Sequence, residues 1–276
     1  MSQSAVPAPA LSTRRVLGID FFNGTPTEAV EHVCKHGGLV VAPGAPSLVA
    51  LQYDGDYRRA IADADLAIAD SGWMVLFWKL LRGEQLTRIS GLAFFKALLA
   101  STDARNPGYL FWVLASENAK TRTLKFASNA NYPVTADDCY IAPNYVDRSR
   151  YSVIHEGSSS GSSHYLTDPD LLAIIERRKP KHIIIAIGGG TQDKLGSYLK
   201  RHLTYAPGIY CIGAAPGFVT GDQVAIPPWA DRFFLGWLFR LIAQPRTFVP
   251  RLWTARSLPF LILRYGREMP PLKSRK

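Results

Sequence analysis

The residues that could carry chemistry in this chain lie where short apolar runs end. Asp70 follows the run 66–69 and precedes Ser71 and Gly72. A carboxylate at the end of a buried strand could act as a general base and take a proton from a hydroxyl group. The same residue could cap a helix that begins near Trp73, because aspartate accepts hydrogen bonds from free helical amides. Position alone favours the cap.

A second candidate is the run Gly188, Gly189 and Gly190, which joins an apolar run to Thr191 and Gln192 at the start of a predicted helix. Glycines at such a turn let a phosphate or a sugar approach the backbone amides. A glycine-rich turn is also ordinary architecture between a strand and a helix, so both interpretations stay open. The spacing matches neither the dinucleotide-binding motif nor the P-loop motif.

Arg88 is the third candidate and follows residues 83–87 in a turn that ends at Gly91. An arginine near a turn is commonly a surface charge. Its guanidinium could equally bind a diphosphate or a sugar, because it offers several donors in one plane. The sequence leaves both roles open.

The sequence contains no spacing that predicts a metal site. Asp63 and Asp65 have the letters of the DxD motif of many sugar-nucleotide transferases, but they precede an apolar strand, and we interpret them as a solvated helix end. Cys34, Cys139 and Cys211 form no CxxC pair, and the histidines show no HxxH or HExxH spacing. We therefore expect no metal and no cofactor. Isolated cysteines fit a reducing cytoplasm.

The elements that must position these residues alternate between short apolar runs and amphipathic segments. This pattern predicts an α/β fold with a mostly parallel sheet and helices on both faces, in the Rossmann-like manner. Ligands bind such sheets beyond the carboxyl ends of the strands, which makes 42–44, 70–72 and 188–192 the important ends. The predicted strands are 16–19, 39–42, 66–69, 109–114, 182–187 and 209–213. The first predicted helix begins near Thr25 and ends before Gly37. The other predicted helices cover 47–64, 73–81, 92–99, 117–127, 168–178 and 192–202. A Gly/Ser-rich stretch at 157–163 predicts a flexible loop.

The positive charge is concentrated at the end of the chain. The 276 residues carry a formal net charge of +10, and residues 229–276 hold +8 of it, with ten Arg and Lys against two acidic residues. A hydrophobic content of 47% predicts a packed core. We predict three parts: a loose tail over 1–14, an α/β domain over 15–228 and a basic appendage over 229–276.

The predicted appendage interleaves bulky apolar residues with arginines. A basic amphipathic helix of this kind suits the surface of an anionic membrane leaflet, and a core helix with solvated arginines would give the same pattern. No run of 18 or more apolar residues is present, so we expect no spanning segment. Nucleic acid is a competing anionic partner, but no nucleic-acid fold pattern accompanies the charge, and we expect none.

With these features, the chain resembles the WecG/TagA/CpsF family of bacterial glycosyltransferases over about residues 16–253. The order and spacing of several motifs carry the resemblance. They are 16–20 with 27–30, the turn 41–44, the strand end 65–72, the turn 88–91, the stretch 180–193, and 237–241 with 244–246.

The resemblance implies a metal-independent, inverting transfer from a UDP-sugar to a lipid-anchored, polyprenyl-diphosphate-linked saccharide acceptor. The protein would be a hexosyl- or N-acetylhexosaminyltransferase of cell-surface polysaccharide synthesis. It would work in the cytoplasm, peripherally on the inner face of the cytoplasmic membrane, with its C-terminal appendage touching the membrane and closing over the active site. A homo-oligomer is left open.

The resemblance also implies roles for individual residues. Asp70 would be the general base, and Arg88 a second catalytic residue. The other implied substrate-binding residues lie in strand-end turns or in the appendage, and they are Pro43, Gly44, Gly72, Gly188, Gly189, Gly190, Gln192, Arg240 and Arg246. Arginines that stabilise the departing UDP would remove the need for a metal ion.

Two other functions stay open. The sequence departs from the family pattern at expected site positions, which are Ala42, Gly44, Thr191, Gly217 and Ala225. A catalytically degenerate member would only bind a sugar nucleotide or scaffold a polysaccharide assembly. A nucleic-acid binder would show salt-dependent DNA binding and no affinity for UDP. The presence of Asp70, Arg88 and Gln192 favours the enzyme.

Overall fold

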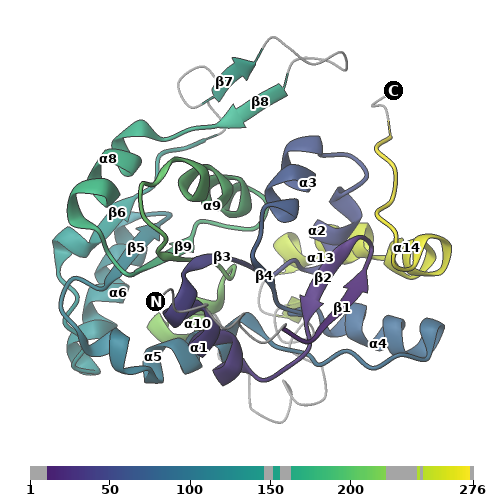
Figure 1. The fold of residues 1–276 in the computed structure, drawn as a ribbon, viewed down its shortest axis with the longest axis horizontal. Helices are drawn as coiled ribbons and strands as arrows, with labels where there is room; N and C mark the ends of the chain where they lie inside the picture. The colour runs from purple at the N-terminus through teal and green to yellow at the C-terminus, as the bar shows by residue number, and fades with distance from the viewer. Residues whose placement is uncertain (1–10, 146–151, 156–162, 222–240, 243–244, 274–276) are drawn as a thin grey trace, which may run out of the picture.

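The computed structural model describes residues 11–145, 152–155, 163–221, 241–242 and 245–273 (Figure 1). Its main feature is an eight-stranded sheet in the order β1-β2-β4-β3-β10-β9-β5-β6. Every neighbouring pair of strands is parallel except β1 and β2. The predicted α/β fold with a mostly parallel sheet is therefore confirmed.

The strands of the main sheet are short. They are β1 (Thr13–Val16), β2 (Ile19–Phe22), β3 (Gly38–Val41), β4 (Leu66–Ala67), β5 (Leu110–Leu114), β6 (Cys139–Ile141), β9 (His182–Ala186) and β10 (Gly208–Cys211). A separate antiparallel hairpin, β7 (Ser152–His155) with β8 (Ser163–Leu166), projects from the body at the top of Figure 1.

Helices connect these strands. They are α1 (Pro26–His36), α2 (Ala45–Ala50), α3 (Gly55–Ala62), α4 (Gly72–Arg82), α5 (Gly91–Ala100), α6 (Glu117–Asn129), α8 (Pro169–Arg178), α9 (Thr191–His202), α10 (Ala215–Thr220), α13 (Pro245–Ala255) and α14 (Leu258–Tyr265). Two 3₁₀ turns cover Thr102–Arg105 and Ala136–Asp138.

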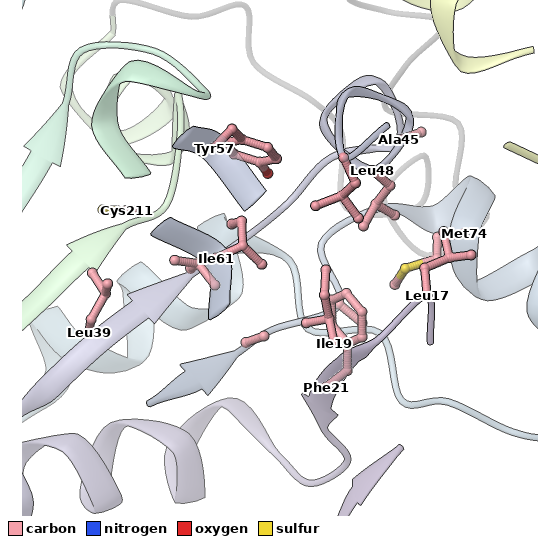
Figure 2. Packing of buried hydrophobic residues seen from close by; sticks show 14 of the residues in the cluster. Leu17, Ile19, Phe21, Leu39, Ala45, Leu48, Tyr57, Ile61, Met74 and Cys211 are labelled. Carbon is pink, nitrogen blue, oxygen red and sulfur yellow. The ribbon is translucent and has the colours of Figure 1, made fainter. Parts of the chain in front are cut away.

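The two faces of the sheet carry two separate hydrophobic layers, because successive side chains of a strand point to opposite faces. In β9, Ile183 and Ile185 pack into one layer and Ile184 into the other. The first layer also holds α2, α3, α4, α8, α9 and α14, and the second holds α1 and α5. Figure 2 shows part of the first layer, with Tyr57 of α3 and Met74 of α4 among its buried side chains.

Local signals in the sequence placed α1 correctly. Thr25 and Glu28 form a capping box, in which the Thr25 amide donates to the Glu28 carboxylate at 2.7 Å and the Glu28 amide donates to the Thr25 hydroxyl at 3.2 Å. Gly37 ends the helix at a positive φ of 70°. Both features are readable from neighbouring residues alone.

Some predictions of single elements were wrong. The predicted strand 16–19 is divided by a two-residue turn, in which Leu17 and Gly18 have positive φ values of 50° and 80°, as a tight hairpin between β1 and β2 requires. The predicted helix 47–64 is two helices, since Asp54 accepts a hydrogen bond from the Tyr57 amide at 2.9 Å and starts α3. Strand β6 was not predicted. The predicted flexible loop 157–163 lies almost wholly outside the described residues.

The C-terminal segment is built into the core. Helix α13 packs on α2, and α14 packs on α2 and α4, at the right of Figure 1. Leu258, Leu261 and Ile262 of α14 are buried. Beyond it, the carbonyl oxygen of Gly266 accepts a hydrogen bond from the Leu17 amide at 2.8 Å. A chain cut before residue 229 would therefore expose part of the hydrophobic core.

We predict that Ile262→Ala lowers the free energy of unfolding by about 2–4 kcal/mol, because it leaves a cavity in a packed layer. The matched control is Leu263→Ala, whose side chain is 59% exposed while that of Ile262 is fully buried. The control should change stability by less than about 0.5 kcal/mol. Urea denaturation measures both, and equal effects would mean that α14 is not part of the core.

Candidate active site

The predicted site turns lie together at the carboxyl edge of the sheet. The turns 42–44, 70–72 and 188–192 follow β3, β4 and β9, and the Ala42 amide donates to the Cys211 carbonyl at the end of β10 at 3.2 Å. Strands β4 and β9 are separated by β3 and β10, so their ends are about 14 Å apart at the usual strand spacing. A ligand that contacts both ends must lie across β3 and β10.

Asp70 is held at one side of this edge. Its carboxylate oxygen Oδ1 accepts a hydrogen bond from the Gly91 amide at 2.9 Å, at the first turn of α5. The hydroxyl of Ser71 caps α4 by accepting from the Met74 amide at 3.2 Å. The interpretation of Asp70 as the cap of α4 was therefore wrong. Asp70 instead joins β4 to the amino end of a different helix.

Arg88 lies against the same strand end. Its Nε donates to the main-chain carbonyl of Asp70 at 3.2 Å, and the next amide, Ile89, donates to the carbonyl of Ala69 at 3.2 Å. The chain between α4 and α5 thus folds back onto β4. The two predicted catalytic residues come together, although 17 residues lie between them in the sequence.

Gly91 is required by a close approach that the sequence did not reveal. A Cβ atom at this position would lie 2.8 Å from the carbonyl oxygen of Ile212 and 3.3 Å from the Cβ of Ala215. The start of α5 is therefore pressed onto the end of β10, where only glycine fits. This contact fixes Asp70 and Arg88 relative to the centre of the edge.

The glycine turn lies at the other side of the edge. Gly188 and Gly190 have φ values of 107° and 85°, which favour glycine, and a Cβ at either position would meet no atom within 4 Å. The turn is therefore open on its outer side. A Cβ on Gly189 would lie 3.7 Å from the hydroxyl of Ser47 in α2, which places the turn beside the segment after β3.

Gln192 lies buried beneath the glycine turn. It is 2% exposed, and its main-chain carbonyl oxygen accepts a hydrogen bond from the Cys211 thiol at 3.1 Å. Its side-chain oxygen Oε1 has no hydrogen-bond partner within the described residues. A buried acceptor without a hydrogen-bond partner costs stability. Such acceptors are found at sites where a ligand supplies the missing hydrogen bond.

The remaining predicted residues are spread over the edge and the C-terminal segment. Pro43 is buried and Gly44 precedes α2, while Gly72 is the first residue of α4. Arg246 is exposed in α13, which packs on α2. Arg240 and the departure Ala225 lie outside the described residues. Helices α4, α5 and α9 all begin at this edge, and the positive ends of their dipoles suit an anionic ligand.

The model of the glycosyl transferase WecG/TagA/CpsF family matches residues 14–273. The chain belongs to this family. A comparison with curated proteins gave no match. Family membership makes the protein a glycosyltransferase of bacterial cell-envelope polysaccharide synthesis, which uses a sugar donor and a lipid-linked acceptor.

The DxD-like pair of this glycosyltransferase lies at the opposite, amino edge of the sheet. Asp65 accepts a hydrogen bond from the Leu39 amide at 2.7 Å and forms an ion pair with Lys200 at 2.6 Å. Asp63 is paired with Arg201 at 2.5 Å. Both carboxylates therefore anchor α9 and β3, and they lie on the side of the sheet away from the strand ends that form the candidate site.

A group of potential metal ligands that the sequence spacing did not show lies at the same amino edge. Ligand atoms of Cys34, Asp103 and His182 all lie within 4.8 Å of one another. Lys181 is 2.6 Å from the Asp103 carboxylate and already balances its charge, and the hydroxyl of Tyr210 is 2.8 Å from His182 Nδ1. The three residues come from α1, a 3₁₀ turn and β9, so only the tertiary fold could bring them together.

Asp193 lies buried at the base of the glycine turn and was not among the predicted site residues. It is 3% exposed, and its oxygen Oδ2 accepts a hydrogen bond from the Gly190 amide at 2.9 Å. Burial raises the pKa of this carboxyl from 3.8 to about 6, and the Gly190 amide offsets only part of that effect. An acidic residue at the third position of a helix was the available signal.

We predict that Asp193→Asn becomes more stable relative to the wild type as the pH rises from 5 to 8. The folded wild type binds the Asp193 proton more tightly than the unfolded chain does, so it loses stability as the pH rises from about 4 through about 6, and the loss levels off near pH 7. Asparagine cannot ionise. The difference in unfolding free energy should shift by about 1.5 kcal/mol over this range. Urea titrations at several pH values measure it, and a pH-independent difference would contradict the prediction.

Proposed function

We propose that this glycosyltransferase moves a hexosyl or N-acetylhexosaminyl group from a UDP-sugar to a polyprenyl-diphosphate-linked acceptor, with inversion at the anomeric carbon. One observation carries the proposal. The Asp70 and Arg88 pair and the open glycine turn of α9 flank the ends of β3 and β10 from opposite sides. A sugar nucleotide lying across these ends would present its diphosphate to the turn and its sugar to Asp70.

The proposed reaction is a single displacement. The acceptor hydroxyl oxygen attacks the anomeric carbon and forms the new C–O bond, while the bond from that carbon to the diphosphate oxygen breaks. UDP leaves with the bonding electrons. The hydroxyl proton passes to the Asp70 carboxylate, which stays oriented through its hydrogen bond from Gly91. Attack opposite the leaving group inverts the anomeric configuration.

The departing UDP gains negative charge, which backbone amides and arginine side chains would stabilise. The amino end of α9 offers partial positive charge beside the glycine turn. Arg88 adds a guanidinium next to Asp70, and Arg240 and Arg246 are the C-terminal candidates. Together they would perform the role that a divalent cation has in other sugar-nucleotide transferases.

We predict that Asp70→Asn lowers kcat by about 10²-fold or more and leaves UDP affinity within about threefold. The amide oxygen of asparagine can still accept from Gly91, so the turn is retained while the base is lost. Asp20→Asn, at an exposed position in β2, is the control. Turnover of UDP-sugar donors measures kcat, and calorimetry measures the affinity for UDP.

Two results would count against this assignment. Near-normal turnover by Asp70→Asn would remove Asp70 from the mechanism. UDP binding by the wild type without transfer to any lipid-linked acceptor would favour the alternative function, a sugar-nucleotide-binding or scaffold protein. DNA binding that weakens with salt, without any UDP affinity, would favour a nucleic-acid binder.

We predict that transfer activity persists after exhaustive dialysis against EDTA. The reason is that the DxD-like pair lies at the amino edge, where Asp63 forms an ion pair with Arg201 and Asp65 forms one with Lys200. Activity before and after chelation is the measurement, with added Mn²⁺ and Mg²⁺ as further samples. Activity that is lost on chelation and restored by either ion would contradict a metal-independent reaction.

We also propose that the C-terminal segment holds the enzyme on the inner face of the cytoplasmic membrane. Large apolar side chains are exposed there, and they are Ile242, Val249, Trp253, Phe260, Leu263 and Leu272. Arg256 lies over the Trp253 ring at 3.5 Å, so a cation and an aromatic side chain share one surface. None of the helices in the described part of the chain has the length and apolar character needed to cross a bilayer.

We predict that the double variant Trp253→Ser, Leu263→Ser loses most of its binding to liposomes that contain anionic lipid. Trp253 and Leu263 are 67% and 59% exposed, so their loss should leave the core intact. Tyr109→Ser, an exposed aromatic residue before β5, is the control. Co-sedimentation at low and high salt measures binding, because basic residues near an anionic leaflet contribute about 1 kcal/mol each and are screened by salt. Unchanged binding would place the membrane contact elsewhere.

A further inference from the structure

We propose that Asp193 is a positioning residue of the donor site, which holds the glycine turn from below and takes up a proton when a diphosphate binds above the turn. The inference rests on the proposed function, because it assumes that the turn receives the diphosphate of the donor. It adds a residue that contacts no substrate and acts through the backbone of the turn.

The geometry gives Asp193 control of the turn. Its oxygen Oδ2 accepts the hydrogen bond of the Gly190 amide, which directs that amide inward and fixes the last residue of the turn. Gly188 and Gly190 both have positive φ values and no side chains, so they add no packing of their own. Two main-chain hydrogen bonds also join the turn to α9, because the Gln192 amide donates to the Gly188 carbonyl at 3.1 Å and the Lys194 amide donates to the Gly190 carbonyl at 3.2 Å. The Asp193 carboxylate is the side-chain attachment between the Gly190 amide and α9.

The surroundings stabilise a negative charge on Asp193 poorly. Its second oxygen, Oδ1, has no hydrogen-bond partner within the described residues. Tyr57 of α3 and Cys211 of β10 face it, and the Asp193 charge raises the pKa of both groups in addition to burial. The nearby cation is Lys194, and Asp54 of α3 already pairs with it at 2.7 Å.

A diphosphate above the turn would make this buried charge still less favourable. Two negative groups close together disfavour each other's ionisation, and burial strengthens the effect. Since the pKa of Asp193 is about 6, the free enzyme carries mostly the carboxylate at pH 7. Binding of UDP should raise that pKa and draw a proton onto Asp193. By linkage, UDP should bind more tightly as the pH falls from 8 to 6.

The test is calorimetric titration of the full-length enzyme with UDP at pH 7, in two buffers with different ionisation enthalpies. The dependence of the heat on the buffer gives the number of protons taken up. UDP itself titrates near this pH, so the wild type is compared with Asp193→Asn under the same conditions. The asparagine side chain of this variant keeps an oxygen that can accept from Gly190, and it cannot take up a proton.

We expect the wild type to take up about half a proton to one proton more than Asp193→Asn. Asp168→Asn is the matched control, because Asp168 is also buried but lies at the start of α8 and accepts hydrogen bonds from Tyr140 and Tyr145. It should behave as the wild type does. Equal proton uptake by the wild type and Asp193→Asn would overturn the inference while leaving the proposed function standing.

A second measurement tests the positioning role. Asp193→Ala should weaken UDP binding about tenfold, and Asp193→Glu should restore most of it, because glutamate keeps the carboxylate. Circular dichroism confirms that each variant is folded. Full affinity in a folded Asp193→Ala variant would overturn the positioning role. Absence of UDP binding by the wild type would overturn the proposed function, and the inference with it.

Discussion

The parallel pairing of β3 with β10, and of β10 with β9, is the constraint on which the rest of the site depends. The register places the ends of these strands at one edge, so the segments after Val41, Ala186 and Cys211 meet there. Helix α9 approaches the sheet closely enough that a Cβ on Gly196 would lie 2.6 Å from the sulfur of Cys211. This close contact brings the amino end of α9, and the glycine turn before it, over the strand ends.

The candidate site is built around backbone groups more than around side-chain charges. Helices α4, α5 and α9 begin at one edge, and glycines at 91 and 188–190 let the chain approach β10 or leave open space above a turn. Such an arrangement suits an anion whose oxygens accept several hydrogen bonds. The cost is the burial of Asp193 and Gln192, whose polar atoms are only partly satisfied, and functional sites commonly retain costs of this kind.

The C-terminal segment connects the core with the surface proposed to contact lipid. Its helix α14 contributes Leu261 and Ile262 to the same hydrophobic layer as Tyr57 and Met74, and it exposes Phe260 and Leu263 on its outer side. The backbone bond from Leu17 to Gly266 ties the same segment to the first hairpin. Helices α13 and α14 thus pack on α2 and α4, which border the candidate site.

The sequence by itself determined the features that depend on neighbouring residues. Apolar runs indicated the central strands, the Thr25 and Glu28 pair indicated the start of α1, and turn composition marked 42–44, 70–72 and 188–192 as the site edge. Only the tertiary structure decided that Asp70 bonds to Gly91, that Asp193 lies buried beneath the turn, and that Cys34, Asp103 and His182 meet. These contacts are between residues that are brought together by the order of the strands and by the close packing of helices on the sheet. Because the strand order and the packing distances are long-range properties, no local pattern encodes them.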